Sequence, residues 1–197
     1  MISRRKFLYG VATVGIAGTD VIKAGSALAH HTGKKKRFTL NPKYLPQTVS
    51  YRSRYKKGTI VVDANARYLY LVEGWGRARR YGVGVGRAAL AWSGTAMIKR
   101  KAEWPRWTPT KNMIKREPHK YAKYAKGVPG GPNNPLGARA LYLYEGNRDT
   151  YYRIHGTNQP WSIGTASSNG CIRMVNDHAI DLYNRTPIGT MVVVLTT

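Results

Sequence analysis

Short apolar runs separated by turn-forming residues dominate the chain from residue 59 onward. β-Branched and aromatic residues make up the runs, and Gly, Pro, Asn and Asp stand between them, as in chains of short strands. The pattern predicts strands at 59–62, 67–72, 80–87, 92–99, 138–144, 151–154 and 191–195. One clear helix is predicted to be capped by Asn176 and to end near Arg185. We therefore expect a mostly β domain built from packed sheets.

Two segments lack a clear period. Residues 30–57 are basic, contain prolines and hold no acidic residue, so they predict a flexible or surface-wrapping arm. Residues 101–131 combine several Pro and Gly residues with Trp and Tyr, and they predict a long irregular loop. A loop of this length in a compact domain is typical of a lid or a binding loop, or of an insertion held by its aromatic side chains.

The first 29 residues have the composition of an export signal. Arg4, Arg5 and Lys6 precede an apolar stretch, and residues 27–29 form a small-x-small cleavage site. The two arginines followed by Phe-Leu resemble a twin-arginine signal, and an ordinary secretory signal fits the same residues. Both routes predict a periplasmic mature protein. The predicted divisions are the signal at 1–29, the basic arm at 30–57 and one catalytic domain at 58–197.

The chain is strongly basic, with 33 Lys and Arg residues against 9 Asp and Glu and a net charge of +24. Such a charge favours an anionic partner. The export signal argues against nucleic acid, which leaves wall carboxylates and, through a weak contact, an anionic membrane surface. The charge is also compatible with a role in solubility alone.

Cys171 is the one cysteine of the chain, so it forms no internal disulfide. An unpaired thiol in an oxidising compartment is either a buried apolar side chain or a reactive group. His155 ends a predicted strand, and a return loop can bring its imidazole to the thiol as a base. Gly170 leaves the backbone bare beside the sulfur, so the amides of Asn169, Gly170 and Cys171 can form an oxyanion hole.

The most specific motif lies between His155 and Met174. It reads His-Gly-Thr and then Ser-Asn-Gly-Cys-Ile-Arg-Met, followed by Asn-Asp, a Leu-Tyr helix and a Gly-Thr-x-Val-Val strand. With Asn-Pro-Leu-Gly-Ala-Arg-Ala at 134–140, these motifs resemble the catalytic domain of YkuD-type L,D-transpeptidases over residues 59–195. The resemblance implies a mixed-sheet β-sandwich with one or two short helices and a long irregular loop.

The resemblance also implies a cysteine acyltransferase of bacterial peptidoglycan. In that family the Cys is acylated by the L-centre of a diaminopimelate stem peptide, terminal D-Ala leaves, and an amine of a second stem resolves the thioester. Cys171 is then the nucleophile, His155 the base, and the Gly156 carbonyl orients the imidazole. Substrate-binding roles are implied for Thr157, Trp161, Ser168 and Arg173, of which the last suits a carboxylate.

Asn169 departs from the family pattern, where a second His usually stands. If that His contributes only its backbone amide and local hydrogen bonds, Asn169 can replace it. If it helps to ionise the thiol, this protein is slower or differently tuned. We expect the first, because His155 already supplies an imidazole.

No set of His, Cys and acidic residues has metal-ligand spacing, and neither a metal nor a cofactor is expected. The glycines at 82, 84 and 86 lack the strand–turn–helix context of a dinucleotide site. His178 is predicted to be surface structure, and His119 to be solvated or near substrate. Carboxylates that remain alternatives to the backbone for orienting the imidazole are Asp149, Asp177 and Asp181.

Three functions remain open from the sequence. The first is a transpeptidase that crosslinks stems or attaches an outer-membrane protein to the wall. The second is a hydrolase, an L,D-carboxypeptidase or endopeptidase in which water replaces the acceptor amine. The third is a non-catalytic peptidoglycan-binding module, against which the intact Cys171 and His155 argue.

Overall fold

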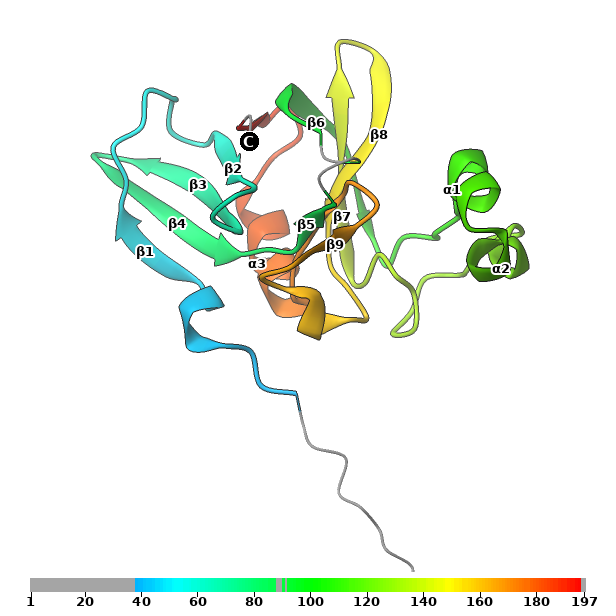
Figure 1. The fold of residues 1–197 in the computed structure, drawn as a ribbon. Helices are drawn as coiled ribbons and strands as arrows, with labels where there is room; N and C mark the ends of the chain where they lie inside the picture. Colours follow the sequence, from blue (N-terminus) through cyan, green and yellow to red (C-terminus); the bar gives the residue numbers. More distant parts are fainter. Residues whose placement is uncertain (1–37, 88–89, 91, 196–197) are drawn as a thin grey trace, which may run out of the picture. The chain divides into compact units, whose positions relative to one another are not determined.

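The computed structural model describes residues 38–87, 90 and 92–195, and the predicted export signal lies outside them (Figure 1). The strands of this part are β1 (Gln47–Ser50), β2 (Ile60–Asp63), β3 (Tyr68–Gly74), β4 (Arg77–Gly82), β5 (Val85–Gly86), β6 (Gly94–Glu103), β7 (Arg139–Glu145), β8 (Arg148–His155), β9 (Ala166–Ser168), β10 (Ile172–Arg173) and β11 (Met191–Val194). The helices are α1 (Lys111–Arg116), α2 (Pro118–Tyr121) and α3 (Asn176–Arg185), with short 3-10 turns η1 (Pro42–Tyr44), η3 (Ala122–Tyr124) and η4 (Pro160–Ser162).

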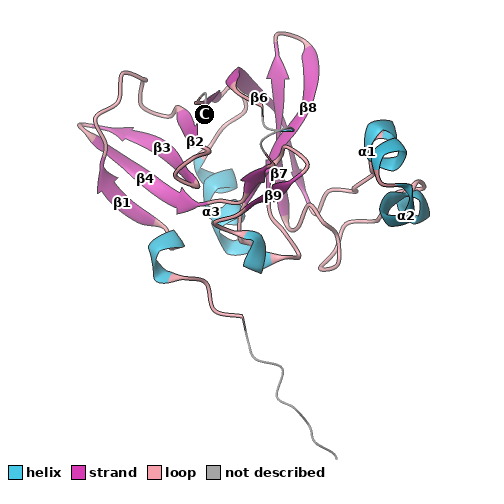
Figure 2. Ribbon diagram, viewed as in Figure 1, coloured by secondary structure: helices cyan, strands magenta, loops and turns pink. Residues whose placement is uncertain are grey.

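The described strands form one large mixed sheet and one small sheet. The large sheet has the order β1-β4-β3-β2-β11-β6-β7-β8-β10, and the small sheet pairs β5 with β9. The β11–β2 and β10–β8 pairs are parallel, whereas the other pairs of the large sheet are antiparallel. In Figure 2 the strands β1, β3 and β4 lie to one side of α3, and β7 and β8 lie to the other. The predicted mostly β fold with a mixed sheet is confirmed.

The core lies where β2 and β11 pair at the centre of the large sheet. Val61 of β2 is opposite Val193 of β11, and residues 60–62 are fully buried. Such continuous β-branched runs suit a strand covered on both faces, where water is excluded from apolar side chains. Beside this core α3 buries Ala179 and Leu182.

Two expectations about α3 are wrong. Val175, not Asn176, is the residue that caps the helix, and this cap makes no side-chain hydrogen bond because valine has no polar side-chain atom. The Asn176 side chain instead accepts hydrogen bonds from two other segments. His178 is not at the surface but is 8% exposed, with its ring 6.4 Å from that of Tyr81. Burial lowers the pKa of His178, so the imidazole stays neutral in the first helical turn, where a cation is disfavoured.

Residues 38–57, the described part of the predicted flexible or surface-wrapping arm, pack on the large sheet. Val49 in β1 pairs with Ala78 of β4, and the Tyr51 ring stacks on Tyr70 at 4.4 Å. Tyr44 lies so close to Gly82 that a side chain there would collide with its ring. The described part of the arm therefore wraps the sheet edge instead of forming a free tail, because strand pairing and Tyr packing hold it.

The predicted irregular loop at 101–131 contains regular structure. Its first residues extend β6, and α1, α2 and η3 follow. The side chain of Thr110 accepts a hydrogen bond from the Met113 amide at 3.1 Å, and Pro118 begins α2, so both helices begin at residue types that ordinarily start helices. Two reciprocal backbone hydrogen bonds between Trp107 and Val128 join the two ends of this segment.

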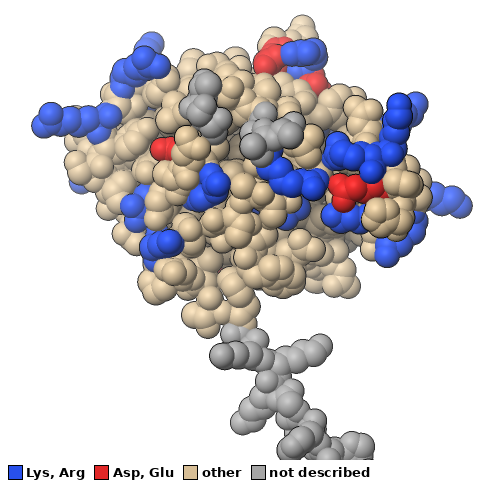
Figure 3. Space-filling view, in the orientation of Figure 1, with Lys and Arg blue, Asp and Glu red and all other residues tan. Residues whose placement is uncertain are grey.

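Basic residues are scattered in groups over the visible surface. Figure 3 shows Lys and Arg spread over this face, with a small acidic patch among them at the end where α1 and α2 lie. Within the described ranges, the helices are all too short or too polar to cross a bilayer.

Candidate active site

The Cys171 thiol is half-buried between β9 and β10 and lies against β8. Ile172 pairs with Ile154 in the parallel β10–β8 register, so Cys171 stands one position before this pair. Its Sγ is 3.9 Å from the carbonyl oxygen of Tyr151, and the backbone N–H of Arg153 also contacts it. The thiol is thus held by two backbone groups of the neighbouring strand.

A local network fixes this stretch of β8. Tyr151 has φ of 61°, a conformation that costs energy for a non-glycine residue. Its amide donates to Asp149 Oδ1 at 2.8 Å, and Arg153 holds both oxygens of the same carboxylate at 2.7 Å. A two-pronged Arg–carboxylate pair is among the strongest side-chain contacts, and it sustains the backbone shape that presents the Tyr151 carbonyl to the sulfur.

His155 lies at the end of β8, only 4% exposed. Its Nδ1 is 2.5 Å from the Gly156 carbonyl oxygen, the contact that the resemblance implied. In the part of the chain that the structure describes, no carboxylate is hydrogen-bonded to this imidazole. Burial lowers the pKa of His155 to about 3, and the neighbouring Arg173 guanidinium adds to the effect, so the imidazole is neutral at pH 7.

The thiol and the imidazole share one sheet edge but are not hydrogen-bonded to each other within the described residues. Arg173, two residues after Cys171, is the register partner of His155. Burial raises the pKa of the Cys171 thiol, and the Arg153 amide opposes this only in part. The resting site therefore holds a neutral thiol and a neutral imidazole, and not a preformed thiolate–imidazolium pair.

The loop before the nucleophile is held by Ser168, which is 2% exposed. Its Oγ donates to the Cys171 carbonyl at 2.6 Å and accepts from the Gly170 amide at 3.2 Å. Ser168 is consequently not available to substrate, contrary to the expectation, and the Gly170 amide is engaged. The amides of Asn169 and Cys171 donate no hydrogen bond in the described chain, so their predicted role as oxyanion donors stays a prediction.

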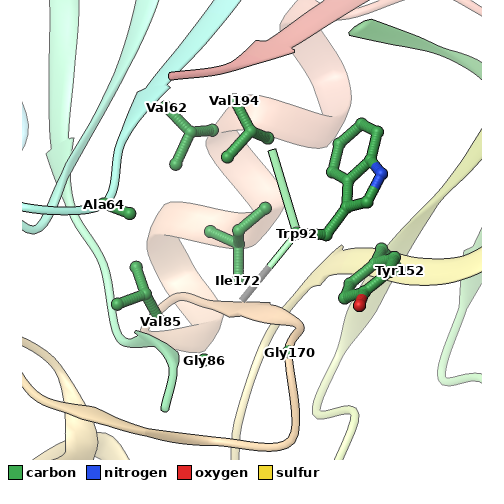
Figure 4. A pocket seen from close by; sticks show the side chains of 9 residues that line it. All are labelled: Val62, Ala64, Val85, Gly86, Trp92, Tyr152, Gly170, Ile172 and Val194. Carbon is green, nitrogen blue, oxygen red and sulfur yellow. The ribbon is translucent and has the colours of Figure 1, made fainter. Parts of the chain in front are cut away.

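Gly170 must be glycine at this position. Its φ is 119°, and a Cβ there would lie 2.5 Å from Tyr152 Cε1 and 2.8 Å from the Leu90 carbonyl oxygen. Behind it, the Trp92 and Tyr152 rings stack at 5.5 Å. They border an apolar recess of about 10 Å³, too small for a substrate, which is lined by Val62, Ala64, Val85, Gly86, Trp92, Tyr152, Gly170, Ile172 and Val194 (Figure 4).

Asn176 joins the three segments that surround His155. Its Oδ1 accepts from the Ala138 amide at 3.0 Å and from the Thr157 amide at 3.1 Å. A Cβ at Gly137 or at Gly156 would collide with this same oxygen. The start of β7, the chain after His155 and the start of α3 therefore meet at one side-chain oxygen, a role that the sequence did not reveal.

The other expected substrate contacts are placed differently. Thr157 is 4% exposed and its hydroxyl accepts from the Gln159 amide at 3.0 Å, so it stabilises a turn and does not face substrate. Trp161 is 62% exposed on η4, and its contact with substrate stays a prediction. Arg173 is half-buried, burial lowers its pKa, and in the described structure its guanidinium has neither a hydrogen bond nor an ion pair. Its binding of a substrate carboxylate stays a prediction.

Asn169 contacts the segment between β6 and β7. Its Oδ1 accepts from Arg87 Nη2 and from Arg116 Nη2, each at 2.9 Å. Its Nδ2 donates to the Tyr121 hydroxyl at 2.8 Å. The side chain that replaces the family's usual His thus binds α1 and α2 to the nucleophile loop. Among the described residues, no group of three or more His, Cys, Asp or Glu is arranged to hold a metal ion.

Comparison with known proteins gives one family. The model of the YkuD family, the L,D-transpeptidase catalytic domain, matches residues 57–194. A curated relative, the probable L,D-transpeptidase ErfK/SrfK of Escherichia coli (strain K12), is 35% identical over 159 residues, which are 77% of this chain and 48% of that protein. The chain spans about half the length of the curated relatives it matches first.

Solved structures share the fold. A Brucella melitensis protein described as a probable carnitine operon oxidoreductase is 56% identical, with a TM-score of 0.55 over 79% of this chain and 96% of that one. An Enterococcus faecium L,D-transpeptidase mutant is 15% identical, with a TM-score of 0.50 over 71% of this chain and 50% of that one, and shows the fold alone.

In this chain, Gly82 and Gly84 of the glycine run pack closely against Tyr44 and the Ser162 carbonyl oxygen.

Proposed function

Because this chain belongs to the YkuD family of L,D-transpeptidase catalytic domains, we propose that it is a peptidoglycan L,D-transpeptidase acting through an acyl-enzyme on Cys171. The observation that carries the proposal is the register of β10 on β8. It brings the Cys171 thiol, the His155 imidazole and the Arg173 guanidinium to one sheet edge. Nucleophile, base and carboxylate-binding cation are the groups that acyl transfer from a stem peptide requires.

Acylation begins when the carbonyl at the L-centre of diaminopimelate approaches the thiol. The Cys171 proton passes to His155, the sulfur bonds to the carbonyl carbon, and the amides of Asn169 and Cys171 stabilise the oxyanion. The C–N bond to D-Ala then breaks, and the imidazolium returns the proton to the leaving amine. The His155 imidazole is neutral at pH 7, the form that can accept the thiol proton, but a pKa of about 3 makes it a weak base in the resting site, so substrate binding has to raise this pKa for the transfer to occur.

Deacylation reverses these roles. An acceptor amine attacks the thioester carbonyl, its proton passes through His155 to the departing Cys171 sulfur, and an amide bond replaces the C–S bond. Apo sites often tighten only when substrate binds, which is consistent with a thiol and an imidazole that are not hydrogen-bonded at rest. Gly156 orients the base through its carbonyl.

The proposed surroundings follow from the same chemistry. The partner is peptidoglycan, either as two stem peptides that become crosslinked or as one stem and an outer-membrane protein. The predicted export signal places the enzyme in the periplasm, where it contributes to cell-wall organisation and cell shape. The excess of Lys and Arg favours approach to the anionic wall and a weak contact with the membrane surface.

Mass spectrometry of the protein incubated with disaccharide-tetrapeptide tests the proposal, with Cys171→Ala and His155→Ala beside it. We expect an acyl adduct on Cys171, D-Ala release and a crosslinked dimer from the wild type only. Tripeptide as the only product, with a protein acceptor also supplied, would establish the L,D-carboxypeptidase instead. A wild-type protein that is folded but forms no adduct and turns over no substrate would support the non-catalytic peptidoglycan-binding module.

A further inference from the structure

The guanidinium groups of Arg87 and Arg116 converge on the nucleophile loop from two directions. Arg87 follows β5 and Arg116 ends α1, yet both donate to the same Asn169 oxygen. Asn169 is two residues before Cys171. A pair of cations is therefore held on the nucleophile loop, apart from Arg173, which lies on β10.

One internal carboxylate faces this cation pair. Glu117 lies 3.2 Å from Arg87 Nη2 and 3.7 Å from Arg116 Nε, and Lys120 Nζ approaches it at 3.3 Å. Three cations against one anion leave a local excess of positive charge. Figure 3 shows basic side chains surrounding a small acidic patch at this end of the molecule.

The contacts of Glu117 are of a kind that another carboxylate can replace. The side chains of Arg87, Arg116 and Lys120 are 47%, 39% and 56% exposed, and water screens ion pairs at such positions. Each arginine meets the carboxylate through one nitrogen, although a guanidinium binds a carboxylate best through two parallel bonds. A ligand carboxylate that offers this geometry competes well with Glu117.

We propose that Arg87 and Arg116 form a subsite for a free carboxylate of the donor stem peptide, which Glu117 occupies until substrate displaces it. This subsite rests on the proposed function, since a stem peptide carries one free carboxylate on the diaminopimelate side chain and one on the terminal D-Ala. Asn169 holds the two guanidinium groups on the nucleophile loop, so its side chain serves specificity.

Calorimetric titration of the Cys171→Ala protein, which binds without turnover, tests the subsite. The ligands are the free tetrapeptide, the form with an amidated diaminopimelate side chain and the form with an amidated D-Ala terminus. Losing a charged contact weakens binding about 3- to 10-fold. We expect one amidated form to lose this affinity only while Arg116 is present, and Arg116→Ala or Arg87→Ala to abolish the difference. That form identifies the bound carboxylate.

Glu117→Gln in the same background separates the subsite from a structural role of Glu117 by the direction in which affinity changes. Removing the internal competitor should tighten binding of the free tetrapeptide about 2- to 5-fold, whereas a merely structural Glu117 would leave binding unchanged or weaken it. Glu145→Gln is the control, because Glu145 pairs with Arg148 at the distant β7–β8 turn and its loss changes the charge equally. We expect it to leave affinity unchanged.

Unchanged or weaker binding by Glu117→Gln, or an amide effect that persists in both arginine variants, would overturn the subsite. These failures are separable from a failure of the proposed function. If wild-type Cys171 still forms its acyl adduct while the subsite results are negative, only the subsite is wrong. If no adduct forms, the transpeptidase proposal itself fails.

Discussion

Asn176→Ala removes the oxygen that accepts hydrogen bonds from the Ala138 and Thr157 amides. Each unsatisfied buried N–H costs about 1–3 kcal/mol. Water can enter beside the half-buried side chain, so we expect a total loss of about 2–4 kcal/mol, a large part of a typical unfolding free energy of about 5–15 kcal/mol. Since Thr157 is two residues after His155, the base should also move.

Urea unfolding followed by fluorescence measures the stability change, and D-Ala release from tetrapeptide measures the effect on the base. A displacement near 1 Å lowers the rate about 100-fold, so we expect kcat/KM to fall about 10- to 100-fold. Asn176→Asp keeps both acceptor contacts and places a negative charge in the first turn of α3, where the helix dipole favours it. It should stay within about 1 kcal/mol of the wild type.

Asn147→Ala is the matched control, since Asn147 is exposed and, among the described residues, its side chain bonds only to Lys99. Such surface changes alter stability by less than about 0.5 kcal/mol. The reasoning is refuted if Asn176→Ala is as stable as this control. It is also refuted if Asn176→Asp loses as much stability as Asn176→Ala, because the acceptor oxygen would then not be the cause.

Three other outcomes follow from the site. Gly170→Ala should lower the free energy of unfolding by about 2–4 kcal/mol, from the positive φ and the collision with Tyr152; urea titration checks this, and wild-type stability would contradict it. The folded pKa of His155 of about 3 lies below its unfolded value of 6.5, so the unfolded chain binds the extra proton between these values. The free energy of unfolding should therefore fall as pH drops from about 6.5 toward 3, by up to about 1.4 kcal/mol per pH unit. Subtracting the pH–stability curve of His155→Gln from that of the wild type isolates the contribution of His155. A difference between the two curves that does not change with pH would disprove it. Because the pKa of Cys171 is above its usual 9.0, its alkylation by iodoacetamide should still accelerate beyond pH 9; a plateau below pH 8 would reveal a preformed thiolate.

Local patterns accounted for much of the fold. Residues 60–62 and 192–194 read as strands because β-branched runs suit fully buried positions, and they form the central parallel pair. The charge pattern predicts the helix at 176–185, although its first residue, Asn176, does not cap it and instead accepts hydrogen bonds from two other segments. By contrast, β10 has two residues, too few for a period, and only its register on β8 shows that it is a strand.

The sequence by itself determined the family, the strand-rich character and the candidate nucleophile and base, because a motif around Cys171 and His155 and the period of apolar residues are local properties. Only the tertiary structure decided which groups surround them. Asn176 reaches Ala138 across 38 residues, and Asn169 meets Arg87 across 82. These hydrogen-bond partners are set by the order of the strands in the sheet and by the way the segment between β6 and β7 folds back. The pattern of apolar residues along the chain carries no information about either.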